Sequence, residues 1–190
     1  MKSSTETDAA SADVTFFATL DRATQEQEFD RLLAANGSAL ARLAASYTNT
    51  PSDRDDLLQE IALAVWQALR TFRGECSPRT FLFRIAHNRA IAHLAHSHAG
   101  SRAKLPAAEV EDVHDPAPDP ESGLAREQAA ERLRRAIHRL PLVYRQVVTL
   151  ALEDMGYADI AEVLGISESN VGARLTRARQ LLRESLEKTK

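Results

Sequence analysis

The sequence predicts an all-α fold made of two small helical domains, and three observations lead to this prediction. Of the 190 residues, 44% are hydrophobic but only 5% are aromatic, and alanine and leucine dominate, a balance that favours helices over sheets. Apolar residues recur at helical spacing in two blocks, and no segment gives a strand signal of comparable strength. A stretch rich in proline and acidic residues separates the blocks.

The first block runs from about residue 26 to 98 and contains three expected helices. The first has apolar residues at helical spacing, namely Phe29, Leu32, Leu33, Leu40, Leu43 and Ala44. The sequence NTPS interrupts the pattern, and Ser52 is a candidate N-cap for the next helix, DRDDLLQEIALAVWQALRTF. The turn RGECSP then leads into the third helix, RTFLFRIAHNRAIAHLAH.

The segment between Gly100 and Gly123 predicts an extended acidic linker. It holds four of the chain's seven prolines, each of which removes an amide donor and disfavours helix at the preceding residue. It also holds six carboxylates and few apolar residues that could offset the entropy of ordering it. On composition alone, a solvated spacer explains this stretch as well as any specific role does.

The second block predicts a helix-turn-helix motif. Its first two helices are indicated by the apolar residues Leu124 to Leu140, stopped by Pro141, and Val143 to Leu152. A short helix then covers Tyr157 to Leu164. Gly165 supplies a left-handed turn and Ser167 caps a helix that runs from about Glu168 to Leu186. Small Ala161 allows the two helices to cross closely, although a purely structural helical hairpin would also explain the pattern.

The outer face of this last helix has the residues that DNA reading needs. We predict that six side chains project outward, namely Ser169, Asn170, Ala173, Arg174, Arg177 and Arg179. Arginines on such a helix contact phosphates or guanine, and its first residues meet base edges. In the alternative interpretation, the arginines belong to a solvated face paired with Glu168 and Glu184. Acidic Asp154, Asp159 and Glu162 on the preceding elements would restrict DNA to one edge.

The remaining features argue against several other classes of protein. The formal net charge is −3, so a nucleic-acid surface must be local. One cysteine excludes a disulfide framework and fits a reducing compartment. No apolar run reaches the roughly 20 residues that span a bilayer, and MKSSTETDAASADVTFF lacks the pattern of a secretory signal. We therefore expect a soluble cytoplasmic protein without membrane insertion.

Nothing in the sequence indicates catalysis or a cofactor. No nucleophile triad, glycine-rich phosphate loop or carboxylate pair stands out, so we do not expect an enzyme. His93, His96 and His98 are close enough in sequence to suggest a metal site, but neither an acidic residue nor a thiolate nearby completes it. We expect no metal and no cofactor, and we prefer DNA-facing or solvated histidines. A redox role for Cys76 has similarly little support.

Two long stretches resemble the extracytoplasmic-function sigma factors of the sigma-70 family. The stretch RLPLVYRQVVTLALEDMGYADIAEVLGISESNVGARLTRARQLLRESL resembles their domain 4, and DRDDLLQEIALAVWQAL with FRGECSPRTFLFRIAHNRAIAHL resembles their domain 2. The resemblance implies a disordered tail over 1–25, domain 2 over 26–99, the acidic linker over 100–121 and domain 4 over 122–190. It covers about residues 26 to 188.

The resemblance also implies partners and site residues. In this family the motif DDLLQE binds the clamp coiled coil of the polymerase β′ subunit, which implies polymerase contacts at Asp56, Gln59 and Glu60. Domain 4 would dock on the β flap and read the −35 element as duplex. An anti-sigma factor is a further implied partner. Without the resemblance, the same acidic face is equally well explained as a solvated helix N-terminus favoured by the helix dipole.

The turn after residue 73 and the following helix resemble the part of domain 2 that captures the −10 element as separated strand. Such a pocket needs flexible backbone, a polar side chain for a base edge and positive charge for phosphates. The residues that the resemblance implies are Gly74, Ser77, Arg79, Arg84, Asn88, Arg89 and His93. Phe81 stands where the family usually has tryptophan, and we interpret it as a structural residue.

Three hypotheses for function follow. An alternative sigma factor would bring bacterial RNA polymerase core to −35 and −10 promoter elements and initiate transcription of a specific regulon. A two-domain regulator would instead bind operator DNA without polymerase. A metal-dependent enzyme or sensor is the third. Binding of duplex promoter DNA by the protein alone would separate the second from the first, and metal analysis would test the third.

Overall fold

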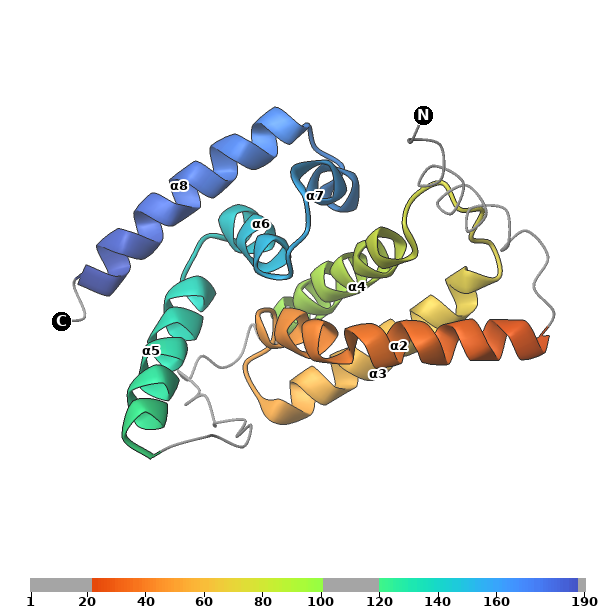
Figure 1. Ribbon diagram of the computed structural model, residues 1–190, viewed down its shortest axis with the longest axis horizontal. Coiled ribbons are helices and arrows are strands. Elements are labelled where there is room, and N and C mark those ends of the chain that lie inside the picture. The colour runs from red at the N-terminus through yellow and green to blue at the C-terminus, as the bar shows by residue number, and fades with distance from the viewer. Residues whose placement is uncertain (1–21, 101–119, 188–190) are drawn as a thin grey trace, which may run out of the picture.

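The computed structural model describes residues 22–100 and 120–187, and within these two ranges the chain forms helices and no strands. The first group comprises α2 (Arg22–Ala45), α3 (Pro51–Leu69) and α4 (Pro78–Gly100). The second comprises α5 (Pro120–His138), α6 (Leu142–Leu152), α7 (Tyr157–Leu164) and α8 (Glu168–Glu187). Figure 1 shows the first group on the right and the second on the left. The predicted all-α class is confirmed, while the N-terminal tail and most of the predicted linker lie outside the described residues.

Helix α2 begins at Arg22, earlier than the expected start of the first domain near residue 26. Its first two turns are tied to α3 by two contacts. The buried Gln25 side chain donates a 2.9 Å hydrogen bond to the carbonyl oxygen of Trp66. One turn later, the ring of Phe29 packs edge-on against Trp66 with 5.3 Å between centroids. These tertiary contacts explain why the helix extends beyond its apolar pattern.

The N-cap of α3 is Thr50 and not Ser52, so the sequence-based assignment of the cap was wrong. The Thr50 hydroxyl accepts a 3.1 Å hydrogen bond from the backbone N–H of Asp53, and Pro51 occupies the first turn. Proline suits the first helical position because its φ is already helical and it has no N–H to satisfy. The cap must therefore precede Pro51. Helix α4 starts in the same way, since Ser77 Oγ accepts a 3.0 Å hydrogen bond from Thr80 N–H and Pro78 follows it.

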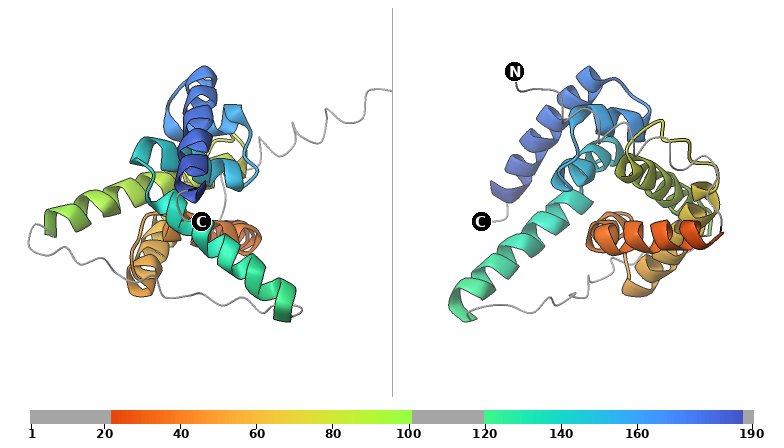
Figure 2. Two further views of the ribbon diagram at one scale, coloured as in Figure 1. Left: turned by 90° about the vertical axis from the view of Figure 1, so that its left-hand side faces the viewer. Right: turned by 45° about the vertical axis from the view of Figure 1, so that its right-hand side comes forward.

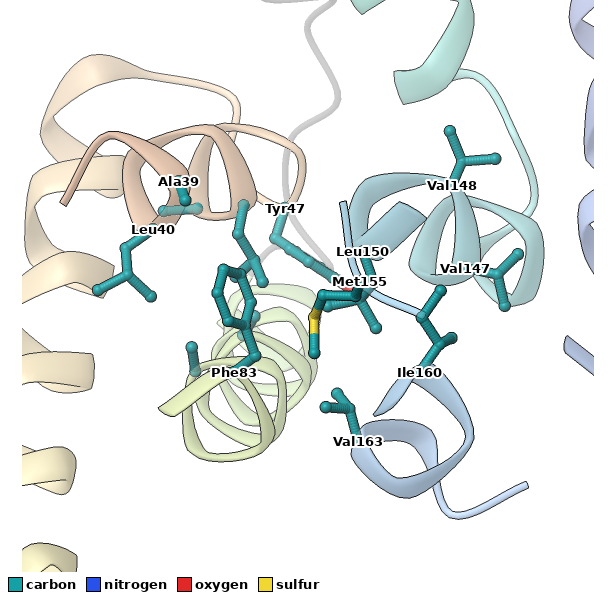
Figure 3. Packing of buried hydrophobic residues seen from close by; sticks show 14 of the residues in the cluster. Ala39, Leu40, Tyr47, Phe83, Val147, Val148, Leu150, Met155, Ile160 and Val163 are labelled. Carbon is teal, nitrogen blue, oxygen red and sulfur yellow. The ribbon is translucent and has the colours of Figure 1, made fainter. Parts of the chain in front are cut away.

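The two groups of helices share one hydrophobic core. The main cluster of buried residues includes Tyr47 and Phe83 from the first group and Leu150, Met155 and Ile160 from the second. Figure 3 shows the Met155 side chain pointing between Phe83 of α4 and Val163 of α7. The α4 and α7 helices therefore meet through an apolar contact as well as the polar contacts described below.

Phe81 lies in a second, smaller cluster that joins Leu32, Leu69 and Phe72. Its side chain is 7% exposed, and its ring lies 4.4 Å from that of Phe72 between centroids. The interpretation of Phe81 as a structural residue is therefore confirmed.

Candidate nucleic-acid interface

Helices α7 and α8 form the predicted helix-turn-helix. Gly165 ends α7 with φ of 64°, in the left-handed region that side chains with a Cβ resist. Ser167 Oγ then accepts a 3.3 Å hydrogen bond from Asn170 N–H at the start of α8. The inner face of α8 is closed to solvent, with Val171 and Ala178 fully buried. The two further views in Figure 2 agree with Figure 1 that α8 lies at the outside of its group.

The outer face of α8 carries the six residues predicted to contact the −35 element. Arg174 is half-buried, and the other five are exposed, namely Ser169, Asn170, Ala173, Arg177 and Arg179. The guanidinium of Arg174 donates a 2.9 Å hydrogen bond to Asn170 Oδ1, and that of Arg177 donates a 2.8 Å bond to Gln180 Oε1. Both partners are neutral amides on the same helix.

No carboxylate among the described residues forms an ion pair with these arginines. Glu184 accepts a 3.0 Å hydrogen bond from Gln180 instead. Among the described residues, Glu168 and Glu184 therefore do not pair with these arginines, as the alternative interpretation expected. The arginines keep positive charge that an anionic partner can neutralise.

A second candidate surface lies between α3 and α4. A shallow hollow of about 460 Å³ opens there, lined by Ala64, Gln67, Ala68, Ile85, Asn88, Arg89 and Ala92. Asn88 and Arg89 are exposed at its rim, so the structure brings together an amide and a cation predicted for −10 recognition. Gln67 was missed by the sequence analysis, because an exposed glutamine on an amphipathic helix carries no distinctive pattern.

The turn before α4 borders another hollow of about 270 Å³, lined by Thr71, Phe72, Arg73, Glu75, Phe81 and Arg84. Gly74 lies in this turn with φ of 71°, a conformation that favours glycine. The turn therefore sets a glycine in a left-handed conformation next to two arginines, Arg73 and Arg84.

The first turns of α4 are already bound by the second group of helices. The Arg84 guanidinium lies 3.2 Å from Glu162 Oε1. Arg79 donates a 2.5 Å hydrogen bond to the carbonyl oxygen of Glu153. The structure thus divides the residues predicted for the −10 element, because Arg79 and Arg84 have partners on the second group while Asn88 and Arg89 remain at the open hollow.

Two hydroxyl groups at the same end of α4 complete this contact. Thr80 donates a 2.7 Å hydrogen bond to Asp159 Oδ1 of α7. The hydroxyl of Ser77, another residue predicted for the −10 element, lies 2.7 Å from that of Thr80. Ser77 is therefore occupied by its capping role and by Thr80.

His93 faces α3. Its Nε2 atom lies 2.7 Å from Asp53 Oδ1 and its Nδ1 atom 3.4 Å from Glu60 Oε1. Burial opposes the charged form, but the hydrogen bonds and charges of Asp53 and Glu60 outweigh it and raise the pKa of His93. His96 Nδ1 lies 2.7 Å from the carbonyl oxygen of Ala92. The side chain of His98 lies outside the described residues, and those that are described contain no group of three potential metal ligands.

The residues predicted to bind polymerase lie together on the outer side of α3. Asp56, Gln59 and Glu60 are all exposed, and the neighbouring Leu63 is 58% exposed. Their spacing places them on one helix face, opposite the fully buried Val65. We call Asp56, Gln59 and Glu60 the acidic α3 surface.

A further ion pair joins the two groups and was not predicted. Arg42 of α2 makes a two-pronged contact with Glu153, with distances of 2.8 and 2.7 Å to its two carboxylate oxygens. The hydrogen bond to Glu153 raises the pKa of Arg42, although burial acts in the opposite direction. Because the partners are 111 residues apart in the chain, no local pattern in the sequence could indicate the pair.

Comparison with known proteins identifies the family. A model of sigma-70 region 2 matches residues 32–99, and a model of sigma-70 region 4 matches residues 130–182. The sigma factor SigM of Mycobacterium tuberculosis, an ECF RNA polymerase sigma factor, is 34% identical over 156 residues, covering 81% of this chain and 74% of SigM. The chain belongs to the extracytoplasmic-function sigma factors of the sigma-70 family.

Other relatives and solved structures agree with this assignment. The RNA polymerase sigma factor NccH of Alcaligenes xylosoxydans xylosoxydans is 31% identical over 160 residues, covering 81% of this chain and 84% of NccH. The structure of CnrH in complex with the cytosolic domain of CnrY is similar with a TM-score of 0.64 and 28% identity, covering 87% of this sigma factor and 91% of CnrH. The sigma factor RpoE of Bartonella quintana, in complex with the anti-sigma factor NepR, shares the fold with a TM-score of 0.68 at 21% identity, covering 85% and 98% of the two chains.

None of the helices that the structure describes in this sigma factor is both long and apolar enough to cross a lipid bilayer.

Proposed function

We propose that this sigma factor binds core RNA polymerase through domain 2 and directs it to promoters by two separate DNA contacts. Helix α8 reads the −35 element as duplex in the major groove. The observation that carries this proposal is the exposed outer face of α8, where Arg177 and Arg179 have no carboxylate partner among the described residues. Such arginines contact phosphates and guanine edges, and Ser169 and Asn170 lie at the N-terminal end that meets bases.

The −10 element is captured as a single strand by the turn around Gly74 and by α4. Asn88 and Arg89 at the hollow between α3 and α4 supply a base-edge partner and a phosphate partner, and Ser77, Arg79, Arg84 and His93 complete the proposed set. A flipped base suits a hollow of this kind because its edge meets an amide while its phosphate meets a cation. In this proposal the catalysis of RNA synthesis belongs to the polymerase, and the sigma factor supplies binding alone.

The acidic α3 surface is the proposed contact for the β′ clamp coiled coil, and domain 4 docks on the β flap. Exposed carboxylates beside a buried stripe suit the basic face of a partner helix. We further propose control by an anti-sigma factor, because CnrH and the Bartonella RpoE were each solved with such a bound regulator or regulator domain. Since polymerase and chromosome are its partners, the proposed site of action is the bacterial cytoplasm.

Run-off transcription with core polymerase, followed by mapping of start sites, tests the proposal. We expect specific transcripts whose start sites share −35 and −10 elements, and none with core alone. The competing hypothesis of a regulator that binds operator DNA without polymerase predicts tight duplex binding by the purified protein and no new transcript. That result would overturn the proposed function.

A further inference from the structure

His93 is the residue through which α4 contacts the acidic side of α3. Its side chain is 13% exposed, and the two contacts described above place a carboxylate at each ring nitrogen, Asp53 at Nε2 and Glu60 at Nδ1. A neutral imidazole has one N–H donor, whereas the protonated ring has two. Both carboxylates can therefore accept a hydrogen bond from His93 only when the ring carries a positive charge.

The carboxylates that hold His93 belong to one acidic stripe of α3. Asp53, Asp56 and Glu60 follow one another at helical spacing, so they lie on the same face of the helix. Asp56 and Glu60 are members of the acidic α3 surface. Glu60 is 49% exposed at its side chain, which leaves it open to a partner in solution while it contacts His93. His93 thus borders the proposed polymerase contact, although it lies on the helix proposed to bind the −10 strand.

The charges that act on His93 come from α3. Asp53 and Glu60 raise its pKa against the opposing effect of burial, and α2, which also packs against α4, contributes no charged group to this site among the described residues. On α4 itself the nearest ionisable side chains are Arg89, which is exposed, and His96, which contacts the carbonyl oxygen of Ala92. A histidine with a raised pKa changes its charge close to neutral pH.

A metal ion does not explain this cluster. The two carboxylates lie at opposite nitrogens of one ring, whereas the ligands of a single ion must converge on it. The described residues also contain no group of three side chains that could hold a metal. The arrangement is that of a proton shared between an imidazole and two flanking acceptors.

We propose that His93 is a positioning residue for polymerase docking, which acts through Glu60 and gives up its proton when a basic partner helix takes that carboxylate. In the free sigma factor the protonated ring holds Glu60 and cancels part of the charge of the acidic α3 surface. A partner cation at Glu60 repels the imidazolium, so docking and protonation oppose each other, and the proton passes to water. This inference rests on the proposed function, since it takes the acidic α3 surface as the polymerase contact.

Coulomb's law gives the expected size of this coupling. With the carboxylate of Glu60 between them, the partner cation and the imidazolium would lie about 6 Å apart, because a charge-assisted hydrogen bond adds about 2.8 Å to the contact already present. At a dielectric constant close to that of water, two charges at this separation change an equilibrium constant about threefold. The affinity for core polymerase should therefore rise about threefold as pH increases through the raised pKa of His93.

The first measurement is titration of labelled full-length protein with core polymerase between about pH 5.5 and pH 8.5. His93→Gln keeps an N–H donor and removes the charge, whereas His93→Lys keeps a charge throughout this range. The Kd of the parent divided by that of either variant should fall about threefold from low to high pH, and groups that titrate on polymerase cancel in this ratio. His93→Lys should bind about threefold more weakly than His93→Gln at every pH.

Two further variants separate this role from a merely structural one. His96→Gln changes the neighbouring histidine on α4, so its Kd relative to the parent should not vary with pH. Glu60→Gln removes the carboxylate that transmits the effect. It should weaken docking, and in its background the change of the His93→Gln ratio with pH should disappear. Thermal melting and circular dichroism of each variant check that the helices are retained.

The second measurement counts protons, which a structural role would not release. Calorimetric titration in two buffers with different heats of ionisation gives the number of protons released on docking. At its maximum near neutral pH, the parent should release about 0.3 proton more than His93→Gln does, as a threefold coupling requires.

Three results would overturn the role of His93. One is a Kd ratio that stays constant with pH, because loss of a structural contact would change the affinity equally throughout. Another is a pH-dependent ratio that persists in the Glu60→Gln background, which would show that Glu60 does not transmit the effect. The third is equal proton release by the parent and His93→Gln. Failure of the parent to bind core at any pH would overturn the proposed function and this inference with it.

Discussion

Helices α4 and α8 both carry arginines proposed to bind DNA, but their arginines have different partners. On α8, Arg174 and Arg177 bond to neutral amides of the same helix. On α4, Arg79 and Arg84 bond to groups about 75 residues later in the chain, at Glu153 and Glu162. The comparison teaches that a basic helix face is free for a binding partner only where its charges lack partners elsewhere in the fold.

The difference also orders the two proposed DNA contacts. The −35 surface on α8 is free in the described structure, whereas the −10 surface on α4 is partly occupied. Polymerase docking, the two DNA surfaces and the support of α4 can each be disturbed separately.

The largest effect is expected at polymerase docking, on which both proposed DNA contacts depend. The double variant Asp56→Lys, Glu60→Lys should weaken binding to core polymerase by about a hundredfold, because apposed like charges cost several kcal/mol. Both residues are exposed, so the fold should be retained. Binding is measured by titration of labelled protein with core.

The matched control for this docking variant is Glu26→Lys, Asp30→Lys on α2, which makes the same change in charge at two exposed positions. This control should bind core polymerase nearly as tightly as the parent does. Glu60 also contacts His93, so the single Asp56→Lys variant checks that the effect does not depend on that contact. Equal binding by the docking variant and its control would show that the acidic α3 surface is not the polymerase contact.

The free −35 surface is tested by Arg177→Ala. Loss of a base-edge contact would cost roughly 1–3 kcal/mol and relax preference at one −35 position. Loss of a phosphate contact would weaken binding to all sequences alike and lower the salt slope by about one. Holoenzyme binding is measured across salt concentrations and −35 variants.

Arg183→Ala is the control for the −35 test, because Arg183 is exposed on the same helix but lies beyond the predicted contact residues. Ala161→Leu tests the support of α8 instead, since Ala161 is 9% exposed in the core that holds α7 and α8 together. Overpacking there should cost roughly 1–3 kcal/mol in the free energy of unfolding. Parental affinity, preference and salt slope for Arg177→Ala would remove Arg177 from the −35 contact.

The sequence predicted the helix-turn-helix almost to the residue, because its signals are local. The short helix spans Tyr157–Leu164 as expected, and Gly165 has the left-handed conformation inferred from its position. The cap of α3 was misplaced because Thr50 and Ser52 are both good capping residues, and the choice depends on the proline between them.

The partners of α4 could not be predicted, although the acidic side chains of α7 were noted as a limit on DNA contact. Thr80 and Asp159 are 79 residues apart, and the tertiary packing of α4 against the second group of helices brings them together. His93 was similarly expected at the DNA because nothing in its own helix indicates the carboxylates of α3. Contacts between distant helices depend on the tertiary fold, which helical periodicity does not encode.

A smaller effect is expected from Asn88→Ala at the −10 surface. Asn88 is exposed at the rim of the hollow between α3 and α4, so its loss should leave the fold intact. Removal of one or two hydrogen bonds, each worth about 0.5–1.5 kcal/mol, should lower the yield of open complex several-fold. Permanganate footprinting measures strand opening.

The same substitution on the other DNA surface provides the comparison. Asn170→Ala removes an amide from α8 and frees Arg174, so it should weaken −35 binding and leave opening of bound complexes unchanged. Asn88→Ala should leave −35 binding unchanged and impair the opening of bound complexes. If both variants lowered duplex binding and strand opening in parallel, the division of labour between α8 and α4 would be wrong.

The smallest effect is expected at His93, which joins α4 to α3 through Asp53 and Glu60. Its pKa is raised by Asp53 and Glu60, so the folded state binds its proton more tightly than the unfolded chain does. The stabilisation is therefore complete below about pH 6.5, the ordinary pKa of histidine, and is lost as pH rises through the higher pKa of the folded state. The effect is small because the Asp53 and Glu60 side chains are 33% and 49% exposed and screened by solvent.

The measurement is the free energy of unfolding from pH 5.5 to 8.5, as a difference between the parent and each of two variants. His93→Gln should be less stable than the parent at low pH, and the difference in the free energy of unfolding should shrink as pH rises. His96→Gln is the control, because the His96 ring contacts only a backbone carbonyl in the described structure. Burial lowers the pKa of His87, which destabilises the fold at low pH, but this contribution is common to all three proteins and cancels in the differences. A gap for His93→Gln that is constant with pH would show that the two α3 carboxylates do not hold a protonated imidazole.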